Sequence, residues 1–450
     1  MDRLIAISAL VATIVGVIAG MFRPKWSFYI FLFLNPFGAL FAATIYASGN
    51  LGLGWPWEPS DILVWVVLAV SLLLPKPVIT ERDPIGVCLW IIAVLAALSL
   101  ALGIVLRFEG AFRAGREMYG VGAALFARRY LVNADRISGF LRFCILVLLA
   151  MFVVHVLVRF GVYAAPIEQW WGKGGGQLGT ERGEVSVTPV LYLALMAIGI
   201  GRLAGQFGRW WVSSICLLAA LSGIVLSETR TLYFGVLAMG LLSLLFIRRR
   251  VQVLAAYGLG LALTLAGAEM VGFDITSRFR TKFGRGEVDV QVMDLGYRNQ
   301  EYGALWSSMA SEPYGLLIGR GAGALHYIPV ARVGDIPFWH SEYLMWLDRF
   351  GVVGFATLCV AMGVTLIGGY RLARTREHPF SCFATIGFLL VATLLIMGVV
   401  NPTFFRRQAT LLLCFLPLVS NSRILAGRAR PPGVDEAYLS AAYSMNLGHL

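Results

Sequence analysis

The sequence predicts an all-α polytopic integral membrane protein with about twelve transmembrane helices and one large external loop. The chain is 58% hydrophobic and only 14% charged, and its mean hydropathy is +0.76, whereas a soluble domain carries about 25% charged residues. Apolar runs long enough to cross a hydrocarbon core of about 30 Å recur from end to end. The sequence lacks the alternating segments of about ten residues that mark a transmembrane barrel.

The apolar runs give twelve or thirteen candidate crossings. The weakest is 119–134, because it contains Arg128 and Arg129 and need not cross at all. We expect the first run to be a retained span, because no small-residue cleavage site follows it. The candidate spans are residues 4–21, 28–47, 61–75, 85–106, 119–134, 141–163, 190–205, 211–227, 231–247, 251–271, 343–370, 381–400 and 408–421.

Basic residues between the spans predict the orientation of the second half. RRR at 248–250, RLARTR at 371–376 and the arginines of the tail are the strongest basic anchors, and such anchors stay on the cytoplasmic side. This places the long hydrophilic stretch on the external side. The predicted organisation is therefore N-terminal transmembrane helices over 1–271, an external loop over 272–342, C-terminal transmembrane helices over 343–425 and a polar cytoplasmic tail over 426–450.

The composition excludes several other classes. The net charge of +12 follows from the basic links between spans, and no basic run is interleaved with stacking aromatics, so we expect no nucleic-acid partner. The six cysteines all lie in apolar segments, which predicts neither a disulfide framework nor a zinc site. No Asp, Glu and His set is clustered in the sequence, so we expect no metal and no cofactor.

LSETRT at 226–231 joins two apolar spans with almost no loop, which leaves Glu228 and Arg230 at the external membrane edge. One interpretation is a snorkelling arginine that pairs with Glu228. The other is an anion clamp at headgroup depth, because burial of an ionisable residue in a membrane is costly. A guanidinium binds phosphate through two parallel hydrogen bonds and keeps its charge at any working pH.

The external loop contains its own predicted structure. GYRNQEYGALWSSMASEP reads as a helix that ends before Pro313, with Arg298, Tyr302, Leu305 and Met309 on one face. GLLIGRGAGALHY then forms a glycine-rich bend. GRGAG at 319–323 is not a nucleotide loop, because no strand precedes it and no βαβ unit surrounds it.

His340 closes the external loop, on the same side as Arg230 and Arg298. A lone histidine at a span end commonly satisfies one hydrogen bond and does nothing more. Here the residue also lies at the end of the loop, and the unperturbed pKa of a histidine side chain, about 6.5, suits a general base near neutral pH.

These residues resemble the motifs of the O-antigen ligase and O-antigen polymerase superfamily of membrane glycosyltransferases. The family's Ser-x-Ser/Thr-Arg turn is matched by Ser227 to Arg230, and its Arg-led loop helix with a downstream tryptophan by Arg298 and Trp306. Pro313, Gly319, Gly321 and Gly323 match its glycine bend. The most specific match is His340-Ser341, then nine residues, then Gly351-Val-Val-Gly354.

The resemblance implies a glycan donor carried on undecaprenyl diphosphate in a bacterial inner membrane, and a glycan or lipid A-core acceptor. It implies that Arg230 and Arg298 hold the diphosphate and that His340 activates the acceptor hydroxyl, without a nucleotide sugar or a metal. We also expect the protein to contact membrane lipids. Further contacts to the substrate are expected from Arg278, Arg280, Arg320, Tyr302 and Ser341.

Two alternatives stay open at the level of sequence. Phe234 stands where ligases of the family often have leucine, so ligase and polymerase activities are both compatible with the motifs. A transporter or flippase of polysaccharide or lipid-linked oligosaccharide would also span the membrane many times and bury charge. Such folds often show inverted repeats and spans broken near mid-membrane, and neither is evident in this sequence. An intramembrane serine protease fits poorly, because Ser341 beside His340 is not by itself a catalytic dyad.

Overall fold

The computed structural model describes residues 14–19, 22–34, 83–108, 118–160, 189–205, 209–227, 229–246, 258–262, 288–324, 341–375, 380–399 and 410–428, with isolated positions between them. At Arg230 and across 288–299 the description covers the backbone alone. Every regular element within these ranges is a helix, which confirms the predicted all-α class.

Helices α5, α10, α11, α12 and α18 lie within a few residues of predicted spans, whereas α8 begins seven residues before the predicted start at 141 and α20 ends seven residues after the predicted end at 421. Five of those described are long and apolar enough to cross a membrane, namely α5, α8, α11, α17 and α18, so the protein is a membrane-embedded, multi-pass one. The predicted spans 4–21, 28–47, 61–75 and 251–271 lie largely outside the described residues, and the total of about twelve stays a prediction. The bounds are α2 Pro24–Leu34, α5 Pro84–Val105, α7 Tyr119–Tyr130, α8 Ala134–Arg159, η2 Pro189–Leu191, α10 Tyr192–Ala204, α11 Trp210–Ser227, α12 Arg230–Ser243, α15 Val288–Ser311, α16 Pro313–Ile318, α17 Glu342–Arg374, α18 Ser381–Gly398, α19 Thr410–Leu413 and α20 Phe415–Arg428.

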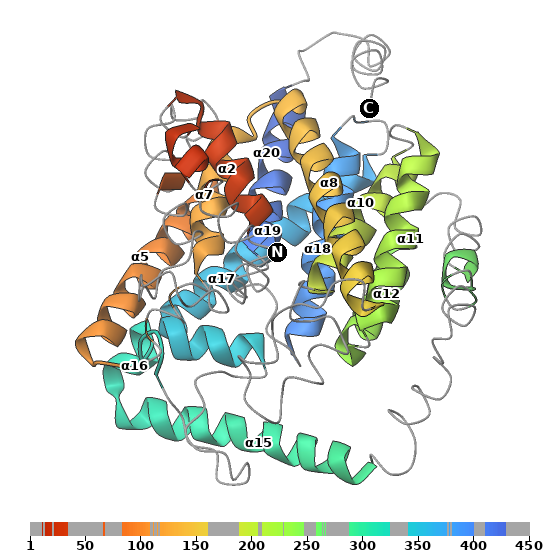
Figure 1. The fold of residues 1–450 in the computed structure, drawn as a ribbon. Coiled ribbons are helices and arrows are strands. Elements are labelled where there is room, and N and C mark those ends of the chain that lie inside the picture. Colours follow the sequence, from red (N-terminus) through yellow and green to blue (C-terminus); the bar gives the residue numbers. More distant parts are fainter. Residues whose placement is uncertain are drawn as a thin grey trace.

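Helix α18 is the centre of the bundle and packs against α10, α12, α17 and α20 (Figure 1). Its eighteen residues carry no charged side chain, and nearly all of them are buried. Small residues let its neighbours approach closely: a Cβ at Gly387 would overlap the side chain of Val419 on α20. Close backbone approach of this kind drives helix association in a membrane, where lipid is as apolar as the side chains.

The weak predicted span 119–134 forms a short helix and then a break. Helix α7 has twelve residues, a rise of about 18 Å, which is too short to cross a core of about 30 Å. Arg128 lies near its end and is buried. Residues 131–133 are not helical, and α8 then starts with Asn133 as its N-cap.

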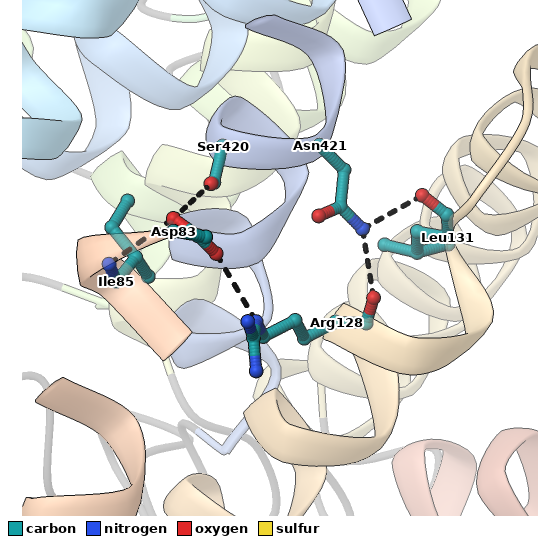
Figure 2. A network of polar contacts seen from close by, with 6 residues as sticks. All are labelled: Asp83, Ile85, Arg128, Leu131, Ser420 and Asn421. Carbon is teal, nitrogen blue, oxygen red and sulfur yellow. Dashed lines mark hydrogen bonds and ion pairs between the residues drawn. The ribbon is translucent and has the colours of Figure 1, made fainter. Parts of the chain in front are cut away.

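A buried polar network fastens α5, α7 and α20 at one end of the bundle (Figure 2). The Asp83 carboxylate accepts hydrogen bonds from the Ile85 backbone N–H at 3.2 Å and the Ser420 hydroxyl at 2.8 Å, and it pairs with Arg128 at 3.1 Å. The Asn421 amide donates to the carbonyls of Arg128 and Leu131, at 2.9 and 2.8 Å. The network therefore caps the start of α5 and the end of α7, whose terminal backbone groups lack helical partners.

At the opposite end of α5, helix α15 lies across the bundle and not along it (Figure 1). It contacts α16 and α17, and its Leu305 and Met309 are buried. Helix α15 begins earlier than predicted, at Val288, and ends as predicted before Pro313. Residues GLLI, which the sequence placed in the glycine bend, belong to α16, and the bend itself starts at Gly319.

Candidate functional site

The turn between α11 and α12 forms the first part of the candidate site. Helix α11 ends at Ser227 and α12 begins at Arg230, so residues 228 and 229 alone join the two helices. The buried Ser227 hydroxyl donates to the Ile224 carbonyl at 2.8 Å, and the Thr229 hydroxyl donates to the Ser227 carbonyl at 3.2 Å. These local bonds fix the turn and place Arg230 at the first position of α12.

The start of α17 forms the second part. Ser341 is the N-cap residue, and its buried hydroxyl donates to the Gly398 carbonyl at 3.3 Å. The Tyr343 hydroxyl donates to the Leu395 carbonyl at 2.6 Å. A Cβ at Gly398 would stand 3.1 Å from the Cβ of Glu342. The start of α17 is therefore held against the last turn of α18.

Helix α12 packs against the same end of α18. A Cβ at Gly235 would stand 2.6 Å from the Met397 sulfur and 3.1 Å from Leu193 of α10. Met397 and Gly398 thus separate the second turn of α12 from the first turn of α17. Two segments more than a hundred residues apart in the sequence therefore contact the same end of α18. Each carries a predicted site residue at or next to its helix start.

The nine residues between Ser341 and Gly351 form one short helix. Gly351 has φ +62° and ψ −169° and breaks α17 into two parts that run in different directions (Figure 1). The first part is Glu342 to Phe350, which is the nine-residue interval of the predicted signature. The predicted span 343–370 lies within α17, which is long and apolar enough to cross a membrane, and the break follows the first eight residues of that span.

The glycine bend crosses α17 at this break. Gly319 has φ +88° and ψ 164°, and both glycines occupy a region of φ and ψ that is essentially closed to other residues. A Cβ at Gly319 would overlap the Arg349 carbonyl, and one at Gly351 would overlap the Leu317 carbonyl. The two backbones are therefore in direct contact, and a side chain at either position would push them apart.

A charged cluster surrounds the crossing. The Arg320 backbone N–H donates to the Asp348 carbonyl at 2.8 Å, and its guanidinium pairs with Asp348 at 3.4 Å and with Glu312 at 3.5 Å. Arg320, Asp348 and the neighbouring Arg349 are all buried. Arg320, predicted to contact substrate, thus has two carboxylate partners within the protein and connects the bend to the end of the short helix. The phenol of Tyr314 lies beside Glu312, and desolvation and the carboxylate raise its pKa above the ordinary value.

On α15, the buried face consists of Glu301, Leu305 and Met309. Leu305 and Met309 lie on it as predicted, whereas Tyr302 is 45% exposed at its edge and Glu301 takes the buried place. Arg298 lies within α15, seven residues before Leu305, and this spacing puts its backbone on the buried side of the helix. Trp306 lies on the exposed side.

The remaining predicted site residues, His340, Arg278 and Arg280, lie outside the described residues. The described chain resumes at Ser341, the residue that immediately follows His340. Within the described ranges, no three His, Cys, Asp or Glu side chains gather in an arrangement that could hold a metal ion.

Glu342 is the site residue that the sequence analysis missed. Its carboxylate is 1% exposed and accepts a hydrogen bond from the Trp346 indole at 2.7 Å. The sequence signal that could have pointed to Glu342 is its place in the first turn of a helix, because the helix dipole stabilises negative charge there. The sequence could not show that the side chain is buried, since burial comes from Gly398 of α18.

A buried His155–Tyr192 pair lies on the neighbouring helices. The Nδ1 atom of His155 and the Tyr192 hydroxyl are 2.8 Å apart, and the two rings stack. A Cβ at Gly223 of α11 would overlap the Tyr192 ring. Gly223 precedes Ser227 by one helical turn. The polar pair therefore lies beside α11, about one helical turn before the connection between α11 and α12.

No protein-family model matches the chain, and no curated protein matches its sequence. A function has to be argued from this chain's own residues.

Proposed function

We propose that the protein is a glycosyltransferase that moves a glycan from undecaprenyl diphosphate to a lipid A-core or glycan acceptor. It would work at the periplasmic face of a bacterial inner membrane, as an O-antigen ligase or polymerase does in surface polysaccharide assembly. The observation that carries the proposal is that the second turn of α12 and the start of α17 pack against the same last turn of α18. The motif Ser227 to Arg230 ends at the first residue of α12, and the motif that begins with His340-Ser341 continues into the start of α17.

The charge of Arg230 gives a second line of support. A cation at the first position of a helix opposes the helix dipole, which favours negative charge there. Residues 228–229 leave no room for a longer loop that could carry the arginine away from the helix start. A bound anion would compensate this arrangement, and a lipid diphosphate is an anion that resides at the membrane edge.

In the proposed mechanism, Arg230 and Arg298 bind the diphosphate and neutralise the charge that grows on it as it leaves. His340 accepts the proton of the acceptor hydroxyl. The acceptor oxygen bonds to the anomeric carbon while the bond from that carbon to the diphosphate oxygen breaks. The products are the glycosylated acceptor, with inverted anomeric configuration, and undecaprenyl diphosphate. Neither a nucleotide nor a cofactor enters this balance.

The test is reconstitution of the full chain in nanodiscs with an undecaprenyl-diphosphate-linked glycan and either lipid A-core or a second glycan. We expect release of undecaprenyl diphosphate that depends on the acceptor, and the productive acceptor distinguishes ligase from polymerase. In sealed vesicles, movement of intact donor between leaflets without any released diphosphate would contradict the proposal and favour a flippase.

A further inference from the structure

The outer surface of α5 shows where lipid contacts the protein at this edge of the bundle. Its exposed apolar side chains recur at three- and four-residue spacing and form one stripe along the helix. Because α5 is long and apolar enough to cross the membrane, this stripe faces acyl chains. The stripe consists of Val87, Ile91, Val94, Leu98, Ala101 and Val105.

Arg107 marks the membrane edge on this side. It is exposed and is the first charged residue after the apolar run of α5. An arginine at the end of a span extends its guanidinium towards the lipid phosphates. The level of other segments can therefore be judged by where they touch α5 relative to Arg107.

The glycine bend touches α5 on the membrane side of Arg107. The Ala322 backbone N–H donates to the Ser99 carbonyl at 2.7 Å, and a Cβ at Gly321 would stand 3.1 Å from Gly103. Ser99 precedes Arg107 by eight residues, which corresponds to about 12 Å along a helix axis. The bend after α16 is thus level with the last turns of the span and does not lie out in water.

The helices next to this bend expose apolar and aromatic side chains. Leu317 of α16 is 59% exposed and Trp306 of α15 is 63% exposed, with Tyr302, Tyr314 and Leu316 also on the surface. Figure 1 shows α16 beside the end of α5 and α15 running crosswise to the bundle. These exposed side chains are apolar or aromatic, as those of the α5 stripe are apolar. The next exposed row of α15 consists of small and polar residues instead, namely Gly303, Ser307 and Ser311, about 100° around the helix from Tyr302 and Trp306.

We propose that α16 and the aromatic flank of α15 form a lipid-binding surface that rests in the boundary between headgroups and acyl chains. A helix with one apolar flank and one polar flank lies in the plane of this boundary. Tryptophan and tyrosine favour the same depth because their rings are apolar and their tips are polar. The C-terminal part of the predicted external loop, from Tyr302 to Ile318, is therefore membrane-associated and not an aqueous segment. This surface does not depend on the proposed enzymatic activity.

Spin labels in lipid nanodiscs test the proposal through access to two relaxation agents. Oxygen concentrates among acyl chains, whereas nickel-EDDA stays in water. The labelled variants are Trp306→Cys and Leu317→Cys, with Val94→Cys as the lipid-facing reference and Ser307→Cys as the water-facing neighbour. All are made in a Cys359→Ala background, because Cys359 is exposed while the other five cysteines are buried.

We expect labels at 306 and 317 to be more accessible to oxygen than to nickel-EDDA, as at 94, with the reverse at 307. The replaced side chains are already exposed, so labelling leaves no cavity in the core. Greater nickel-EDDA access at both 306 and 317 would overturn the proposal. If soluble oligosaccharide then protected those labels, the surface would instead be assigned to stacking on sugar rings. Loss of glycan transfer would not affect either outcome.

Discussion

Arg230 is the residue whose chemistry can be tested most directly. A planar guanidinium can hold a diphosphate through two parallel hydrogen bonds, which the ammonium of lysine cannot reproduce. We expect Arg230→Lys to reduce glycan transfer roughly 10- to 100-fold, the cost of one lost charge-assisted hydrogen bond. Transfer is measured at matched protein level with purified donor. An arginine that only snorkels would tolerate lysine, so normal transfer by the variant would return Arg230 to a structural role.

His340 is expected to act on the acceptor and not on the donor. Loss of a general base typically lowers the rate by about 10²- to 10⁴-fold. We predict that His340→Ala abolishes turnover while binding of the lipid-linked donor, measured separately, is retained. Ser341→Asn is the matched control, because the amide of asparagine can still donate a hydrogen bond, as the Ser341 hydroxyl does to the Gly398 carbonyl. Loss of donor binding in His340→Ala would group the histidine with the arginines, and normal turnover would remove it from the mechanism.

At the scale of elements, the break in α17 depends on Gly351. A Cβ there would overlap the Leu317 carbonyl, and the backbone conformation is one that only glycine adopts readily. We expect Gly351→Ala to lower the free energy of unfolding by roughly 2–3 kcal/mol. A thermal-unfolding midpoint in detergent well below that of the wild type would report this.

Gly363, in the second part of α17, provides the matched control for Gly351. A Cβ there would meet nothing within 4 Å, and its backbone is helical. Gly363→Ala should leave the midpoint unchanged or raise it, because alanine in a helix is favoured over glycine by about 0.5–1 kcal/mol. Equal midpoints for the two variants would mean that the crossing does not hold the break in place.

The Asp83–Arg128 pair offers a second test between elements. Asp83→Asn retains an N-cap and a partner for Ser420, but it leaves the buried Arg128 without its counter-charge. We expect a cost of about 3–5 kcal/mol, and a smaller one in the double variant Asp83→Asn/Arg128→Met. The unfolding midpoints of the single and double variants measure the coupling. Additive losses would show that the ion pair does not stabilise the contact between α5 and α7.

For the whole molecule, the orientation in the membrane is the first property to test. The basic anchors predict that α15 is external and that the far end of α17 is cytoplasmic. In a Cys359→Ala background, Ser307→Cys should react with an impermeant thiol reagent in intact spheroplasts. Thr375→Cys, the C-cap of α17, should react only after the membrane is opened. The opposite pattern would invert the topology and exclude a periplasmic active site.

Much of this architecture could be predicted from the sequence. The spans α5, α8, α11 and α18 follow apolar runs because lipid cannot satisfy an exposed backbone, so hydropathy and length report the helix directly. Pro313 predicted the end of α15, because proline cannot continue a preceding helix. The turn at 228–229 and the glycine bend were also predictable from the sequence, because each depends on residues that are neighbours in the chain.

What the tertiary structure alone decided are the pairings between distant segments. Asp83 and Ser420 are 337 positions apart, and Arg320 meets Asp348 only because the bend crosses α17. Gly351 stands in an apolar run that reads as one span, and its break requires the Leu317 backbone on the other side of the crossing. Glu342 is buried because Gly398 brings α18 close to it. Local pattern reports what a segment can become by itself, whereas burial, ion pairing and a positive φ within a helix depend on which other segment arrives beside it.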